Sequence, residues 1–235
     1  MKKINKIRFA IIIAIDYELS NLNLNYETIK IHDQTYYLIH DEIILMFSGI
    51  GKVNASYKTA LLIMNFNPQH IINIGSAGCC NPAVQILTVN IADKCQYGDV
   101  DVSCDPKYEI NQIPYEPKYF YTHQPTLQWL NELLTGLDIN VINQTAITID
   151  SFVTQANKHH FYELQQNDVG SVDMESCAIA QVCHHYKTNF NCIKIVSDNI
   201  HHQSNHDEFN NNMHQIALTS KKIITSIVNS LMDKK

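Results

Sequence analysis

The chain has 235 residues, a formal net charge of −6 and 45% hydrophobic residues. This length and composition are typical of one globular domain with a large core. A phosphate-binding surface needs clustered basic residues, so 23 acidic against 17 basic residues argue against a nucleic-acid-binding protein.

The first apolar stretch, residues 9–15, superficially resembles a signal peptide. This stretch is short, however, and is followed by Asp16 and Glu18 rather than by a cleavage site, so we expect a buried strand. The seven cysteines form no CxxC pair, and an odd count without a secretory signal indicates reduced thiols. No stretch is long enough to cross a membrane. We therefore expect a cytoplasmic protein without a membrane partner.

The remaining chain alternates between apolar, β-branched stretches and helical patterns, which predicts a single α/β domain over residues 1–235. Strands are expected at 9–15, 26–31, 36–39, 43–47, 69–74, 86–92, 96–102, 141–149 and 190–196. Helices are expected at 53–66, 125–134, 158–165, 176–186 and 206–232. A long loop rich in proline and tyrosine is expected at 103–123, and loops of this length are often functional.

Four of the seven glycines fall in two short runs, 49–51 and 75–78, and each run follows an expected strand. Glycine suits left-handed turns and positions where the backbone approaches a ligand closely. We therefore predict two glycine loops at the carboxyl ends of buried strands. Open α/β sheets bind small molecules at such positions, which indicates an enzyme.

Three carboxylates also lie at expected strand ends, next to apolar sequence: Glu18, Glu175 and Asp198. Desolvation at such a position raises the pKa of a carboxyl group and makes it useful as an acid or base near neutral pH. Any one of them is better explained as a helix cap. The presence of all three carboxylates at strand ends, where α/β sheets hold their ligand sites, modestly favours a catalytic role.

Four motifs resemble, in order and spacing, those of the 5′-methylthioadenosine/S-adenosylhomocysteine nucleosidases, members of the purine nucleoside phosphorylase superfamily. The motifs are 48–53 (SGIGKV), 71–78 (IINIGSAG), 173–180 (DMESCAIA) and Ser197-Asp198. The resemblance covers nearly the whole chain. It implies a three-layer αβα domain with a mixed central β-sheet, a homodimer, and no metal or cofactor. The implied reaction hydrolyses the N-glycosidic bond of 5′-thio-substituted adenosines and releases adenine and a thioribose.

The resemblance also implies roles for individual residues. Glu18 matches the acid that activates the attacking water. Asp198, oriented by Ser197, matches the acid that protonates N7 of the departing adenine. Glu175, with the backbone of Met174, matches the group that binds the ribose hydroxyls.

Further matches concern the base and the 5′ substituent. Phe152 matches the aromatic residue stacked on adenine, and the backbone of Val153 reads the base edge. Ser76 and Gly78 match the segment beneath the ribose, and Ile50 the wall beside the 5′ substituent.

The chain departs from the family pattern at several positions. Cys79-Cys80 follow Gly78 where a further glycine is usual, and Lys194 replaces an arginine on the ribose side. His206 takes the place of a phenylalanine in the pocket for the 5′ substituent, and Asp105 lies near the place of a second one. The changes at His206 and Asp105 predict a more polar pocket that binds the methylthio group less well, relative to homocysteine, than is usual in the family.

The only arginine is Arg8, on an expected strand. Phosphorylases of the superfamily bind phosphate with arginines, whose fork of N–H donors suits that anion, so water is the expected nucleophile. A nucleosidase for another adenine nucleoside, of the 5′-deoxyadenosine or aminofutalosine type, remains an alternative. So does a catalytically weak purine-binding homologue. His201, His202 and His206 are better explained by a solvated loop than by a metal site.

Overall fold

The computed structural model describes residues 6–16, 25–161 and 168–232. The predicted catalytic residue Glu18 lies outside these ranges.

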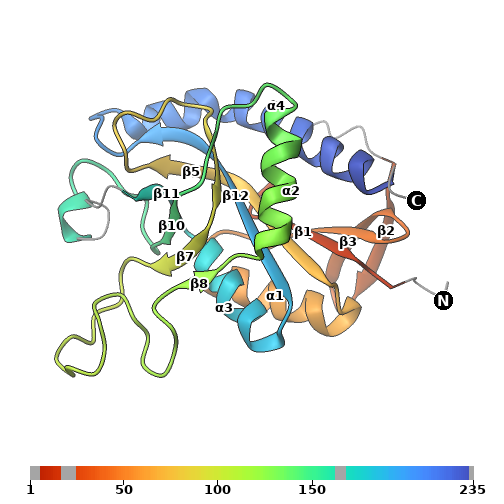
Figure 1. Ribbon diagram of the computed structural model, residues 1–235, viewed down its shortest axis with the longest axis horizontal. Helices are drawn as coiled ribbons and strands as arrows, with labels where there is room; N and C mark the ends of the chain where they lie inside the picture. Colours follow the sequence, from red (N-terminus) through yellow and green to blue (C-terminus); the bar gives the residue numbers. More distant parts are fainter. Residues whose placement is uncertain (1–5, 17–24, 162–167, 233–235) are drawn as a thin grey trace.

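The described residues form a mixed sheet of twelve strands, which crosses the molecule (Figure 1). The strands are β1 (Phe9–Ile13), β2 (Glu27–Ile31), β3 (Gln34–His40), β4 (Ile43–Phe47), β5 (His70–Cys79), β6 (Val89–Ala92), β7 (Lys94–Tyr97), β8 (Phe120–Tyr121), β9 (Val141–Ile142), β10 (Thr145–Thr148), β11 (Val169–Asp173) and β12 (Asn189–Asn199). Their main order is β2-β3-β4-β1-β5-β11-β10-β7-β8, while β12 pairs with both β5 and β6, and β6 also pairs with β9.

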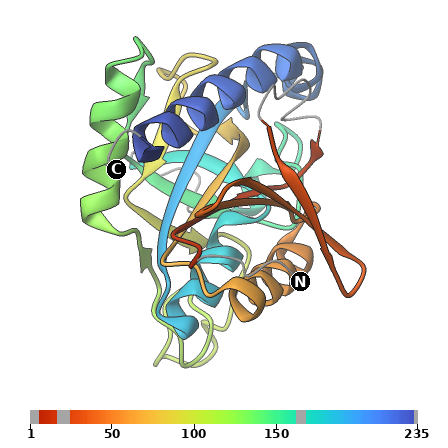
Figure 2. The same cartoon turned by 90° about the vertical axis from the view of Figure 1, so that its right-hand side faces the viewer.

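Helices cover both faces of this sheet, as expected for a three-layer αβα fold (Figure 2). They are α1 (Lys52–Phe66), α2 (Gln124–Thr135), α3 (Ser176–Tyr186) and α4 (Asn205–Met232), with a short 3₁₀ helix at Lys158–His160. α1 packs with α3 on one face, and α2 packs with α4 on the other. None of the helices in these ranges has the length and apolar character of a membrane span.

The two larger of the three apolar clusters among the described residues, one per face, hold the layers together. Leu62 of α1 and Ile179 of α3 are fully buried in one core. Leu130 of α2 and Ile224 of α4 are fully buried in the other. β1, which reads FAIII, is buried along its whole length between the two cores. Burying one such side chain contributes roughly 1.5–3 kcal/mol, so these cores stabilise the sheet whose strand ends carry the site residues.

The second glycine run corrects one prediction. Residues 75–78 form the carboxyl end of β5 rather than a loop. This segment continues as a strand because each of its residues pairs with β12, from Gly75 opposite Lys194 to Gly78 opposite Asp198. The expected strand 141–149 is likewise divided into β9 and β10, and the expected strand 96–102 ends at Tyr97.

The first glycine run has the backbone that was expected. Gly49 and Gly51 have φ angles of +81° and +93°, in the region that residues with a Cβ rarely adopt. The chain turns here from β4 into α1. The long segment between β7 and β8 is irregular, as predicted, and extends away from the sheet (Figure 1).

Candidate active site

A cavity of about 220 Å³ opens where β5, β11 and β12 meet. Most of the predicted site residues in the described ranges line it: Ile50, Ser76, Gly78, Phe152, Val153, Met174, Glu175, Ser197 and Asp198. The motifs recognised in the sequence therefore converge on one cavity, although they lie on or directly after four different strands, β4, β5, β11 and β12.

The end of β5 positions this site by pairing with two different strands. Gly78 lies opposite Val172 of β11 in an antiparallel pair and opposite Asp198 of β12 in a parallel pair. A Cβ on Gly78 would lie 3.2 Å from side-chain atoms of Val172 and Ile200 and 3.4 Å from Asp198 Oδ2. Glycine thus lets the three strands approach closely at the cavity wall. A register shift between Val196 and Asp198 leaves Ser197 as the extra residue of a β-bulge.

Asp198 is 2% exposed, and each of its two carboxyl oxygens has a hydrogen-bond partner. Ser197 Oγ lies 2.6 Å from Oδ1, and Asn205 Nδ2 donates to Oδ2 at 2.9 Å. Burial raises the pKa of Asp198, whereas the hydrogen bonds from Ser197 and Asn205 oppose that rise. The net pKa lies above its ordinary value, which suits a carboxyl group that donates a proton.

Ser197 can serve both protonation states of this carboxyl group. Its Oγ also lies 3.0 Å from the carbonyl oxygen of Ala77, and a hydroxyl has a single hydrogen to donate. With Asp198 charged, Ser197 can donate to Oδ1. With Oδ1 protonated, Asp198 can donate to Ser197, and Ser197 to Ala77. In either state Ser197 remains the hydrogen-bond partner of Asp198 Oδ1.

The glycine turn after β4 holds the second carboxylate. The backbone N–H of Gly51 donates to Glu175 Oε1 at 2.9 Å, and Glu175 is 5% exposed. A left-handed glycine turn is one way to direct a backbone N–H into a cavity. The sequence motifs 48–53 and 173–180 are therefore joined by a direct hydrogen bond.

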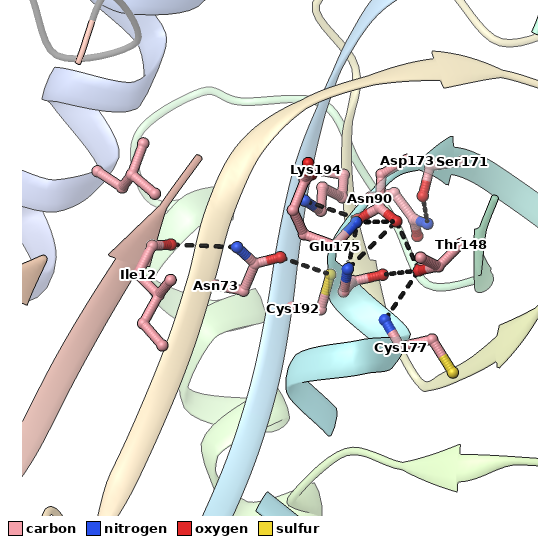
Figure 3. Close-up of polar contacts among 12 residues, drawn as sticks. Ile12, Asn73, Asn90, Thr148, Ser171, Asp173, Glu175, Cys177, Cys192 and Lys194 are labelled. Carbon is pink, nitrogen blue, oxygen red and sulfur yellow. Dashed lines mark hydrogen bonds and ion pairs between the residues drawn. The ribbon is translucent and has the colours of Figure 1, made fainter. Parts of the chain in front are cut away.

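A buried ion pair fixes the turn that carries Glu175 (Figure 3). Lys194 Nζ lies 2.7 Å from Asp173 Oδ2, and both side chains are 1% exposed. Thr148 donates to Asp173 Oδ1 at 2.7 Å, and the backbone N–H of Ser176, at the start of α3, donates to the same carboxylate. Burial opposes the charge on Lys194, yet the Asp173 carboxylate outweighs it and leaves the pKa of Lys194 raised.

Aromatic side chains form another part of the cavity lining. The Phe152 ring lies edge-on to Phe209, with ring centroids 5.6 Å apart, and both residues line the cavity. Phe152 is 38% exposed, so one part of its ring is open to a ligand. Val153 and Asp198 line the same cavity as Phe152.

Comparison with known proteins fits this geometry. Residues 8–229 match the family model of the phosphorylase superfamily. A 5′-methylthioadenosine/S-adenosylhomocysteine nucleosidase of Bacillus subtilis is 34% identical over 188 residues, which cover 80% of each chain. The enzyme of the same name from Buchnera aphidicola is 36% identical over 203 residues, covering 86% of this chain and 85% of the relative. The chain belongs to the 5′-methylthioadenosine/S-adenosylhomocysteine nucleosidase family.

Solved structures of nucleosidases in this family share the fold closely. The S-adenosylhomocysteine nucleosidase of Streptococcus pyogenes, in complex with 5-methylthiotubericidin, superposes with a TM-score of 0.85 at 28% identity, covering 97% of this chain and 99% of that one. The Neisseria meningitidis nucleosidase, in complex with methylthio-immucillin-A, gives a TM-score of 0.86 at 27% identity, with 95% and 99% covered. The predicted nucleoside phosphorylase-like α/β fold is thereby confirmed.

His206 lies in a different place from the other predicted residues of this nucleosidase site. Its side chain is exposed, contacts the Phe152 ring at 5.5 Å between centroids, and is not among the residues that line the cavity. Phe209, one helical turn further along α4, lines the cavity instead. The expected role of His206 in binding the 5′ substituent stays a prediction.

Several residues of the site were not predicted from the sequence. Asp173, Lys194 and Phe209 line the cavity, and Asn205 holds Asp198. Lys194 was noticed only as a departure from the family pattern, although a lysine within an apolar strand is itself a signal of a buried ion pair. Among the described residues, no group of three or more metal-ligating side chains could hold an ion.

Proposed function

We propose that the chain hydrolyses the N-glycosidic bond of 5′-thio-substituted adenosines, 5′-methylthioadenosine and S-adenosylhomocysteine, and releases adenine and a thioribose. The single observation that carries this proposal is the buried Asp198 carboxyl group, with its raised pKa, in a cavity shared with Glu175 and Phe152. Its place in the cavity and its raised pKa both support a role for Asp198 as the acid at adenine N7.

The proposed reaction breaks the bond between ribose C1′ and adenine N9. The bonding electron pair leaves with adenine, and Asp198 gives its proton to N7, which makes the base a better leaving group. The ribose becomes cation-like, and Glu175, whose proposed role is to bind its hydroxyls with the backbone of Met174, lies in the same cavity. Water adds its oxygen to C1′ and passes a proton to Glu18.

Within this proposal the remaining residues bind the substrate. Phe152 stacks on adenine, and the Val153 backbone reads the base edge. Ser76 and Gly78 lie beneath the ribose, and Ile50 lies beside the 5′ substituent. All five line the cavity, which supports these assignments.

Water rather than phosphate is the proposed nucleophile. The only arginine of the chain, Arg8, precedes β1 and pairs with Glu42 at 3.1 Å. The cavity is lined by Ala14 and Ile15, beyond the other end of β1. A bidentate guanidinium clamp for phosphate therefore cannot form within one subunit.

The proposal extends to assembly and cellular setting. Val53, Tyr57 and Met64 expose apolar side chains on α1, with exposed fractions of 79%, 51% and 69%. They lie on the same side of the helix as judged by their spacing, which supports a homodimer with α1 in its interface.

Buried free thiols on β5, β7, α3 and β12 support the cytoplasm as the location. Adenine and thioribose release would serve sulfur and methionine salvage. We further propose that residues 1–235 form one domain.

The test is the release of free adenine from a panel of nucleosides in phosphate-free buffer. The panel holds 5′-methylthioadenosine, S-adenosylhomocysteine, 5′-deoxyadenosine and aminofutalosine. We expect the two thio-substituted compounds to be cleaved most efficiently. Preferential cleavage of another member would show that a different adenine nucleoside is the substrate. If no compound were cleaved, the hydrolase proposal would fail in favour of a purine-binding protein.

A further inference from the structure

Asn205, the first residue of α4, has a buried amide to which the proposed reaction gives no role. It is 1% exposed, and its Nδ2 donates to the Val153 carbonyl oxygen at 2.8 Å and to Asp198 Oδ2 at 2.9 Å. A primary amide nitrogen carries two hydrogens, so each acceptor receives one. Val153 and Asp198 both line the cavity, whereas Asn205 is not among its lining residues.

The two acceptors belong to separate parts of the chain. Val153 follows β10 in an irregular segment, and Asp198 lies near the end of β12. In the proposed complex one group reads the adenine edge and the other protonates N7, so their separation has to match a single purine. A carbonyl oxygen has two lone pairs, and bonding to Asn205 leaves one for the base.

We propose that Asn205 is a positioning residue, whose amide sets the Val153 carbonyl and the Asp198 carboxyl group at the separation that adenine requires. This inference rests on the proposed function, because it deepens the account of the same site. Asn205 begins α4, and the helix that contributes Phe209 to the cavity thereby also orients the acid.

The charges around Asp198 define what the amide does to its titration. From α4, Glu208 raises the pKa of Asp198 and His206 lowers it, while His202 lies 2.7 Å from Glu208. From the end of β5, the Cys79 and Cys80 thiols have raised pKa values because of burial, so they are neutral neighbours. The Asn205 N–H stabilises the charged carboxylate, and its removal raises the pKa of Asp198 further.

Two substitutions separate the amide hydrogens from the shape of the side chain. Asn205→Leu keeps the number and branching of the side-chain heavy atoms but has no donor, and Asn205→Asp keeps the shape but places a second carboxylate beside Asp198. The matched control is Asn73→Leu on β5. Asn73 is also 1% exposed and also donates through Nδ2 to a backbone carbonyl, that of Ile12 (Figure 3).

The measurements are kcat and KM for 5′-methylthioadenosine as a function of pH, and the affinity for adenine by calorimetry. Asp198 must be protonated to act as an acid, so kcat falls as pH rises through its pKa in the complex. In Asn205→Leu this fall moves to higher pH, and in Asn205→Asp it moves further. Adenine affinity drops about tenfold or more in both, because the Val153 carbonyl and the Asp198 carboxyl group are no longer held at the separation that matches the base. Asn73→Leu lowers the melting temperature without moving the pH profile.

Folded Asn205 variants with the parental pH profile and adenine affinity would overturn the inference and leave Asn205 as an ordinary helix start. The same result follows if Asn73→Leu moves the profile equally. If the parent chain binds adenine but cleaves no nucleoside, the proposed function fails. The positioning role is then decided by adenine affinity alone, which must still fall in Asn205→Leu.

Discussion

At the scale of single residues, the site combines polar groups that are costly to bury. Asp198 is a buried carboxyl group whose pKa is raised mainly by desolvation. A raised pKa means that the folded chain binds a proton more tightly than the unfolded chain does. The contribution of Asp198 to stability is therefore largest below its unfolded pKa and declines as pH rises through its folded pKa.

This direction of the pH dependence of stability leads to a prediction for Asp198→Asn. The variant loses about 100- to 10,000-fold in kcat, since it cannot donate a proton to N7. Its melting temperature nevertheless exceeds that of the parent, and the gap widens as pH rises from acidic to neutral, because the amide avoids burying a charge. Calorimetry across this pH range measures the gap. A gap that narrows with rising pH would contradict the burial of a raised-pKa carboxyl group.

The Asp173–Lys194 pair leads to a prediction in the opposite direction. Lys194→Met leaves the Asp173 carboxylate buried without its ion-pair partner, which costs about 3–5 kcal/mol in the free energy of unfolding. Urea denaturation measures the loss. The control is Lys30→Met on the exposed face of β2, which we expect to change the free energy of unfolding by less than about 0.5 kcal/mol. A loss for Lys194→Met as small as that of Lys30→Met would mean that the pair is hydrated.

At the scale of elements, sequence patterns predicted the order of strands and helices better than their ends. Buried runs such as Phe9–Ile13 are recognisable because every position is apolar. The extension of β5 through residues 75–78 was missed, because glycine and serine disfavour strands locally and only pairing with β12 explains them. Pairing partners are distant in sequence and invisible to local patterns.

Local patterns also limited the prediction of the site. Glu175 and Asp198 were recognised from their position after strands and from family motifs. The sequence pattern predicts a loop at Asn205 and an ordinary helical position at Phe209, because the roles of both residues depend on where α4 begins relative to β12. Contacts across elements, such as that of Asn205 with Val153, cannot be read from spacing along the chain.

Gly78 tests the close approach of three elements. In Gly78→Ala the new methyl group would press on Val172, Ile200 and Asp198, so we expect kcat/KM to fall about tenfold or more. Gly136→Ala is the matched control, since Gly136 ends α2 with a helical φ of −63° and alanine fits there. Activity assays on both variants decide the matter. Parental activity in Gly78→Ala would show that the cavity wall can yield without moving Asp198.

At the scale of the whole molecule, the exposed stripe on α1 predicts self-association. Light scattering of the parent chain should give the mass of a dimer. Val53→Glu should weaken it, because a charge would be buried in an apolar interface. Lys30→Glu, on exposed β2, is the control that should remain dimeric. A parent chain that is monomeric and fully active would remove the assembly from the proposal.

The central claim is that a single α/β domain with one arginine uses its buried acid to cleave a nucleoside with water. The most direct test compares 5′-methylthioadenosine cleavage in phosphate-free and phosphate-rich buffers, with both products identified by mass spectrometry. We expect equal rates of adenine release, and free 5-methylthioribose as the second product, in both buffers. A phosphate-dependent rate, with the 1-phosphate of the sugar as product, would contradict it.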